Sequence, residues 1–209
     1  MTEPIRPQGM KLLQKEVELV IAPDRSEETI LDLIGEFDGV ITRTTKITRE
    51  MMERSARLKV IGRHGAGLDL VDMDAASEHG ICVVHTPGAN ARSVAEFVVA
   101  MMLALSRYLI PADYAQRVER QFKRRDQFLG HDLQNKTLGI IGMGRVGREV
   151  AKICRGGFDM RILGFDPWVT KEDLASIGAE KVETVEDILK NSDFVSLNCP
   201  LTADNRGFD

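Results

Sequence analysis

The chain has 209 residues and a formal net charge of -4, and its residues are 43% hydrophobic and 29% charged. This composition is typical of a globular protein with one or two domains that can bury a core. The acidic balance argues against a nucleic acid or an anionic membrane as the main partner, because both select concentrated basic surfaces. The longest apolar run, Phe97 to Leu105, is far shorter than the ~20 residues that cross a bilayer.

The first residues, MTEPIRPQGMK, carry no apolar stretch behind a basic segment, so no secretory signal is predicted and we expect a cytoplasmic protein. The three cysteines, Cys82, Cys154 and Cys199, lack CxxC or Cys/His spacing. We therefore expect neither a disulfide framework nor a metal site. The basic cluster from Arg117 to Arg125 is typical of the solvated face of a helix.

From residue 17, short apolar runs alternate with amphipathic stretches, which is typical of a parallel sheet covered by helices. Ser26, Thr48 and Asp72 can each cap a helix with a side-chain oxygen. The helix after Thr48 is expected to run to about Leu58, and Gly80 is expected to end the helix that follows Asp72. Strands of this α/β unit are predicted at residues 17–21, 40–41, 59–61 and 81–85.

A proline–glycine break at residues 87–88 is followed by a helix predicted over residues 93–108, which is apolar on nearly every side. Such a helix must be covered all round, which indicates a position between two domains or two subunits. A polar, basic helix is expected over residues 112–128, and we place a domain boundary between residues 89 and 90. A second alternating series follows, with strands at 137–141, 161–165 and 193–197 and helices at 145–155, 171–177 and 185–191.

The second series opens with a glycine-rich turn between a hydrophobic strand and an amphipathic helix, the pattern of a dinucleotide-binding turn. In that pattern Gly142 permits the turn, Gly144 lets the backbone approach a pyrophosphate, and Gly147 lets the helix pack on the strand. Amide hydrogens from Arg145 and Val146 onward would face the phosphates at the positive end of the helix dipole. The Arg145 guanidinium can add a charge-assisted contact.

Glycines also collect at such turns for structural reasons alone. An acidic residue after the next strand is therefore needed to indicate that the turn binds a nucleotide. Asp166 ends that strand ~20 residues beyond the motif, where a carboxylate can accept both ribose hydroxyls of an adenosine. Its charge repels a 2′-phosphate, which favours NAD over NADP. A methyltransferase that uses S-adenosylmethionine is the alternative. Asp166 suits that ribose equally well, whereas Arg145 in a pyrophosphate-facing position does not.

With these residues in view, the chain resembles the D-isomer-specific 2-hydroxyacid dehydrogenase family. The resemblance covers essentially the whole chain and rests on four stretches: LKVIGRHGAGLDLVD (58–72), HTPGANARSVAEF (85–97), LGIIGMGRVG (138–147) and SLNCPLTADNRG (196–207). It implies an α/β chain with a flavodoxin-like substrate domain over residues 1–89. The first half of a Rossmann-type doubly wound parallel sheet, which binds NAD, follows over residues 90–209.

The resemblance also implies where ligands bind. Backbone amides around Ala66 and Gly67 would hold the substrate carboxylate, since a glycine turn can converge its donors on an anion. Val94 would lie beside the nicotinamide. A plain glycine loop and a simple helix start are the structural alternatives at these two places. Around the adenine half of the cofactor, the resemblance points to Asn198, Cys199, Pro200 and Thr202.

Three positions depart from the family's pattern. Leu70 stands where the family commonly has asparagine, so any polar role is lost there. Asn198 stands where the family often has histidine, and Asn205 where it often has threonine. Both amides can still donate hydrogen bonds.

The reaction that the resemblance implies is hydride transfer between C4 of the nicotinamide and C2 of a small D-2-hydroxy acid or 2-keto acid of the phosphoglycerate, glyoxylate or hydroxypyruvate type. The family's catalytic arginine, glutamate and general-acid histidine come from segments after the PLT motif, so no catalytic residue is predicted up to Asp209. We therefore expect the working protein to continue beyond Asp209 and the 209-residue chain alone to be inactive.

Two further expectations concern partners. An NAD(H)-binding sensor, similar to the corepressors of the same fold that bind NAD without turnover, is the alternative to an enzyme. The apolar helix over residues 93–108 predicts a homodimer, because two-fold self-association is the commonest way to cover such a surface.

Overall fold

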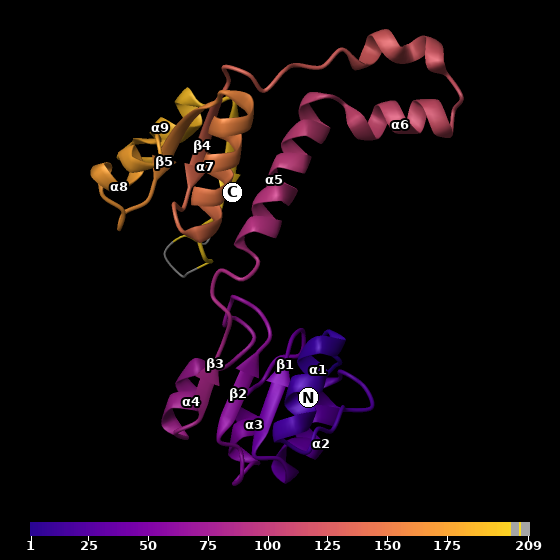
Figure 1. The fold of residues 1–209 in the computed structure, drawn as a ribbon, viewed down its shortest axis with the longest axis vertical. Coiled ribbons are helices and arrows are strands. Elements are labelled where there is room, and N and C mark those ends of the chain that lie inside the picture. The colour runs from indigo at the N-terminus through magenta and orange to yellow at the C-terminus, as the bar shows by residue number, and fades with distance from the viewer. Residues whose placement is uncertain (202–204, 206–209) are drawn as a thin grey trace. The chain divides into compact units, whose positions relative to one another are not determined.

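The computed structural model describes residues 1–201 and 205. The chain forms two compact units, Met1–Asn90 and Ala91–Asp209. Each unit is built around its own parallel sheet with helices beside it (Figure 1). The α/β class with parallel strands is thus confirmed.

The first unit contains a three-stranded sheet of order β1-β2-β3, in which all neighbours are parallel. Its core is formed by side chains such as Ile47, Met51 and Ile61, each at most 1% exposed, from the strands, the helices and the segments between them. The elements are α1 (Pro7–Glu16), α2 (Glu27–Leu33), the 3₁₀ helix η1 (Ile34–Glu36), β1 (Gly39–Thr42), α3 (Arg49–Glu53), β2 (Val60–Arg63), α4 (Met73–Glu78) and β3 (Cys82–Val84).

The helix starts of this unit follow the predicted caps. The side chains of Ser26, Thr48 and Asp72 each accept a hydrogen bond from an amide in the first turn of their helix. The predicted end of α3 near Leu58 is wrong, because the helix ends at Glu53. There the Ser55 hydroxyl donates to the Ile34 carbonyl and accepts from the Leu58 amide, so the chain turns towards β2 instead of continuing the helix.

The strand predicted at residues 17–21 is also wrong, since this segment belongs to no sheet. Met1 lies between it and β1: the Met1 ammonium donates to the Val20 carbonyl at 2.6 Å and the Met1 carbonyl accepts from the Ala22 amide at 2.9 Å. The Thr2 amide in turn donates to the Ile41 carbonyl of β1 at 2.9 Å. Two hydrogen bonds to a single residue do not make a strand pairing. Residues 17–21 therefore form no strand, despite their apolar composition.

Glu3 fixes the amino-terminal segment to the loop after β1. Its carboxylate is buried and accepts hydrogen bonds from the Thr44 amide at 2.7 Å and the Thr44 hydroxyl at 2.6 Å. Arg25 lies 3.7 Å from the other carboxylate oxygen. Burial acts to raise the pKa of Glu3, but the two bonds from Thr44 and the charges of Arg25 and Arg43 outweigh it, and the pKa lies below its ordinary value.

A carboxylate with a lowered pKa stabilises the folded state above its unfolded pKa, and this contribution is lost as the pH falls through the folded pKa. We therefore predict that Glu3→Gln lowers the free energy of unfolding by ~1–3 kcal/mol at pH 7, where a charged acceptor is lost. The deficit should shrink below pH 4.5, the ordinary glutamate pKa, as the wild-type carboxyl takes up a proton. Urea unfolding of both proteins between pH 7 and pH 3 measures this, and a deficit that does not change with pH would contradict it.

The second unit contains a four-stranded parallel sheet of order β6-β5-β4-β7. Counted along the chain within this unit, the order is 3-2-1-4, the first half of the dinucleotide-binding order. Its elements are α5 (Ala91–Ser106), α6 (Leu109–Arg117), the 3₁₀ helix η2 (Phe122–Phe128), β4 (Thr137–Ile141), α7 (Arg145–Phe158), β5 (Arg161–Phe165), α8 (Lys171–Ser176), β6 (Glu180–Lys181), α9 (Val185–Asn191) and β7 (Phe194–Leu197). The three predicted strands are present, and the two-residue edge strand β6 was not predicted.

Helix α5 packs along α7 on one side of this sheet (Figure 1). Ala95, Val99 and Met102 of α5 belong to the same buried cluster as Val150 and Cys154 of α7. Burial raises the pKa of the Cys154 thiol to about 11, so the group stays neutral and acts as an apolar side chain near pH 7. The face of α5 towards α7 is therefore covered within the unit itself.

The single basic helix predicted over residues 112–128 is wrong, because two shorter helices stand there. Helix α6 ends at Arg117, and Arg120 has a left-handed φ of 55° before η2 begins. The Gln121 amide donates back to the Ala115 carbonyl at 2.9 Å, which turns η2 against α6. Within the described residues no single helix has the length and hydropathy to span a bilayer; α5 and α6 meet that test only as a pair bent by 64°.

Candidate functional site

The turn between β4 and α7 is possible only because Gly142 has no side chain. Its φ is 92°, a left-handed conformation that favours glycine. A Cβ atom at this position would lie 2.6 Å from the Cys199 amide nitrogen and 2.7 Å from the Asn198 carbonyl carbon. The chain leaving β7 thus passes directly over the turn.

The other two glycines of the motif differ sharply in their surroundings. A Cβ at Gly147 would lie 2.2 Å from the Gly142 carbonyl oxygen, so α7 packs directly on the turn. At Gly144 a Cβ would meet no atom within 4 Å, and its φ of -73° is open to any residue. The protein's own packing therefore explains Gly142 and Gly147 but leaves open space above Gly144.

The start of α7 has unpaired amide donors beside this space. The first turn of a helix has no helical acceptors for its amides, and Gly144, the N-cap, offers no side chain to replace them. Gly144 and Arg145 are exposed, and Val146 is half-buried. With the positive end of the helix dipole behind these amides, the position favours an anion.

Asp166 lies at this turn. It follows β5 directly, its Oδ2 accepts from the Met143 amide at 2.9 Å, and its Oδ1 accepts from the Trp168 amide at 3.0 Å. Each carboxylate oxygen keeps lone-pair capacity for a further donor. The acid is thus hydrogen-bonded to the glycine turn itself, one residue before Gly144.

The end of β7 completes this edge of the sheet. The Asn198 amide donates to the Ile141 carbonyl at 2.7 Å and extends the pairing of β7 with β4, while the Asn198 side chain donates to the Ser196 hydroxyl at 2.9 Å. Cys199 is half-buried and Pro200 is exposed. Thr202, the fourth residue predicted here, lies outside the described residues. Because β5 and β7 flank β4 on opposite sides, a crevice for a ligand is expected at this point of the sheet.

Val94 lies in the first turn of α5 and is half-buried. The guanidinium of Arg92, two residues earlier, donates to Glu96 at 2.8 Å and to Glu149 of α7 at 3.4 Å. The start of α5 is thereby fixed to α7 within the same unit.

The predicted substrate loop belongs to the first unit. Ala66 and Gly67 follow β2, and the Ala66 carbonyl lies 2.9 Å from Nδ1 of His85. The Thr86 amide donates to the Gly65 carbonyl at 3.1 Å, so the chain after β3 supports the loop. Among the described residues, no acceptor is found for the amides of Ala66 and Gly67. These two donors are free for an anion.

Two features were not predicted: the contact of Arg148 with the glycine turn, and the proximity of Arg43 and Arg63 in the sheet of the first unit. Arg148 Nε donates to the Met143 carbonyl inside the glycine turn at 3.0 Å, and the only sequence signal is a basic residue directly after the motif. In the first unit, Arg43 follows β1 and Arg63 ends β2, so two guanidinium groups start from neighbouring positions at one sheet edge. No group of three His, Cys, Asp or Glu side chains in the described part of the chain is placed to hold a metal ion.

The sequence matches a known protein family. A family model described as "D-isomer specific 2-hydroxyacid dehydrogenase, catalytic domain" matches residues 1–197. The chain belongs to this family. The resemblance seen in four stretches of the sequence is therefore confirmed.

The chain is similar to the D-3-phosphoglycerate dehydrogenase of Methanocaldococcus jannaschii, with 39% identity over 98% of this chain and 39% of the relative's own length. The hydroxypyruvate reductase of Thermotoga maritima is 37% identical over 98% of this chain and 65% of its own length. Among solved structures, the NAD⁺-bound 3-phosphoglycerate dehydrogenase of Entamoeba histolytica has a TM-score of 0.78 and 31% identity, covering 98% of this chain and 62% of its own. The chain thus spans between about two fifths and two thirds of the length of these relatives.

The different surroundings of Gly144 and Gly147 predict different effects of a side chain on stability. Gly147→Ala should destabilise the second unit by ~1–3 kcal/mol, because its Cβ would press on the backbone of the turn. Gly144→Ala should leave the unfolding temperature nearly unchanged, because its Cβ would enter open space. Gly156→Ala, on the same helix and also in open space, is the matched control and should be neutral or stabilising. Calorimetric melting of the three variants tests this, and equal melting of Gly147→Ala and wild type would contradict it.

Proposed function

We propose that this chain carries the cofactor site and the carboxylate-binding loop of an NAD-dependent D-2-hydroxyacid dehydrogenase, which transfers a hydride between NAD(H) and a small D-2-hydroxy acid or 2-keto acid. The observation that carries the proposal is the open space at Gly144, bordered by the uncapped amides of α7 and by Asp166. Membership of the family gives the reaction class.

The residues present fit the dinucleotide. The amides of Gly144, Arg145 and Val146 would bind the diphosphate, with the Arg145 guanidinium adding charge. Asp166 would accept the hydroxyls of the adenosine ribose, and its charge disfavours a 2′-phosphate, so NAD is preferred to NADP. Asn198, Cys199 and Pro200 would border the adenine half, and Val94 the nicotinamide. Bound NAD(H) supplies the hydride chemistry, and this chain supplies binding and orientation.

The substrate would bind through its carboxylate to the free amides of Ala66 and Gly67. Arg43 and Arg63 start from the carboxyl ends of paired strands, since Thr42 lies opposite Arg63 in the β1–β2 register. Two guanidinium groups at this edge favour a substrate with a second anionic group, such as a phosphate, at the end away from its carboxylate. Of the substrate types that the sequence leaves open, the phosphoglycerate type fits this edge best.

The cofactor site is tested by direct binding. We predict that the wild-type chain binds NADH more tightly than NADPH, followed by the fluorescence of Trp168, which is exposed two residues after Asp166. Gly144→Val fills the open space and should weaken NADH binding at least ~10-fold, whereas Gly156→Ala should leave it unchanged. Unchanged NADH affinity in a folded Gly144→Val variant would contradict the proposed site. In the full-length protein, loss of NADH absorbance that depends on a 2-keto acid separates an enzyme from an NAD(H) sensor.

The substrate preference has its own test. In the full-length protein, Arg43→Gln should raise the KM for a phosphate-bearing 2-hydroxy acid ~10-fold, which corresponds to the loss of one charged contact. The KM for glyoxylate, which has no second anionic group, should stay within about twofold, so the variant carries its own control. Equal changes for both substrates would contradict a role for Arg43 in reading the far end of the substrate.

We also propose that the protein forms a homodimer. Phe97, Met101 and Leu105 of α5 are 63%, 45% and 72% exposed and follow each other at intervals of four, so they form one stripe on a single helix face. Exposed apolar side chains also occur on α6, among them Ile110 and Tyr114. Exposed apolar side chains in these numbers are uncommon on a monomer, and a second copy of the chain can cover them symmetrically.

We predict that Leu105→Lys yields a monomer where the wild type is a dimer, because the ammonium group would be desolvated in the interface. Leu189→Lys is the matched control: Leu189 is 60% exposed on α9, outside the stripe, and its variant should remain dimeric. Light scattering coupled to size-exclusion chromatography gives the masses. A wild-type protein that is monomeric at micromolar concentration would remove this part of the proposal.

A further inference from the structure

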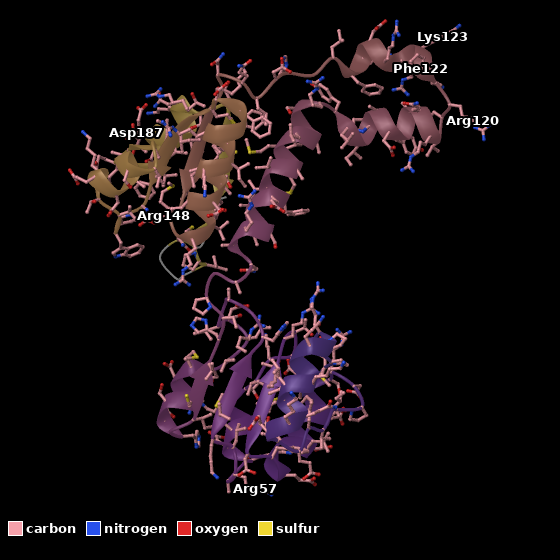
Figure 2. All side chains as sticks on the ribbon, viewed as in Figure 1. Arg57, Arg120, Phe122, Lys123, Arg148 and Asp187 are labelled. Carbon is pink, nitrogen blue, oxygen red and sulfur yellow. The ribbon has the colours of Figure 1, made fainter. Side chains whose placement is uncertain are left out.

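Met143 lies between the first two glycines of the turn, and its side chain, its amide and its carbonyl each make a contact that fixes it. Its side chain is fully buried and packs against β5, where a Cβ at Gly164 would come within 3.0 Å of its Cγ. Its amide donates to Asp166, and its carbonyl oxygen accepts from Nε of Arg148 at 3.0 Å. Arg148 is half-buried near the start of α7, at the end of the helix that joins the turn (Figure 2).

The two backbone contacts of Met143 fix two different peptide groups. In a trans peptide, the carbonyl of one residue and the amide of the next lie in one plane and point in opposite directions. The bond to Asp166 therefore fixes the Gly142–Met143 peptide, whose carbonyl faces Gly147. The bond to Arg148 fixes the Met143–Gly144 peptide, so the Gly144 amide points away from the Arg148 side chain.

The orientation of the Met143–Gly144 peptide depends on its contact with Arg148. Gly144 has no Cβ to restrict its backbone angles, and nothing within 4 Å surrounds the place where one would be. Without the contact to Arg148, the Met143–Gly144 peptide can rotate and direct its carbonyl, instead of its amide, towards the open space. A carbonyl dipole there would repel a diphosphate.

We propose that Arg148 is a positioning residue for the dinucleotide: it holds the Met143 carbonyl so that the Gly144 amide already faces the diphosphate position before the cofactor arrives. This inference rests on the proposed function. It gives Arg148 a role that differs from that of Arg145, because Arg148 acts on the backbone of the turn and Arg145 on the ligand. The gain comes from preorganisation, since the donor does not have to be reoriented on binding.

The affinity test uses three substitutions on α7: Arg148→Met, Arg148→Lys and the control Lys152→Met. Arg148→Met removes the donor and the charge, whereas Lys152→Met removes a charge from an exposed position one turn further along the helix. By calorimetry, Arg148→Met should bind NADH ~10-fold more weakly than the wild type, and Lys152→Met within about threefold of it. Arg148→Lys keeps a cationic donor and should restore most of the affinity. Equal losses in Arg148→Met and Lys152→Met would show a general effect of charge and overturn the inference.

A second readout needs no cofactor. In the unliganded protein labelled with ¹⁵N, Arg148→Met should add exchange broadening at the Gly144 amide, because its peptide gains a second orientation, while the melting temperature stays within a few degrees of the wild type. A Gly144 signal unchanged in Arg148→Met would overturn the inference, even if the variant binds NADH weakly. A wild-type protein that binds no nicotinamide nucleotide would contradict the proposed function instead, and the two failures are therefore distinguishable.

Discussion

The site depends on how closely three backbone segments approach one another at the carboxyl end of β4. The turn at Gly142, the start of α7 at Gly147 and the chain leaving β7 at Cys199 meet at distances that leave no room for a side chain. This contact orients α7 so that its first amides lie beside Asp166 at the end of β5. The proposed binding of a diphosphate and of a ribose both require that orientation.

Electrostatics then separates the roles of the groups around the turn. The uncapped amides of α7 provide partial positive charge where a diphosphate would lie, and Asp166 provides a full negative charge where hydroxyl donors would lie. In the first unit the corresponding groups are all positive or partly positive, because free amides at Ala66 and Gly67 share one sheet edge with Arg43 and Arg63. In the proposed function, the second unit would bind the dinucleotide and the first the small acid.

The sequence predicted what depends on neighbouring residues. The caps at Ser26, Thr48 and Asp72 and the three longer strands of the second unit are set by local hydrogen bonds and by the spacing of apolar side chains. Strand β6 has only two residues, which is too short to form a pattern.

The errors arose where a distant contact decides the outcome. Residues 17–21 have strand-like composition but meet only Met1, and the basic segment over residues 112–128 is broken at Arg120, where the chain folds back on Ala115. The glycines and Asp166 could be found because their spacing is a known pattern. Arg148 could not, since its contact with the Met143 carbonyl follows from the path of the turn in space.

One consequence of the Asp166 contacts concerns attempts to exchange NAD for NADP. Replacing the acid with a small neutral residue removes the charge that opposes an extra phosphate, but it also releases the Met143 and Trp168 amides that the carboxylate holds. The proposed preference for NAD and the geometry of the turn therefore depend on the same carboxylate. A redesign that switches the preference has to supply a new acceptor for those amides at the same time.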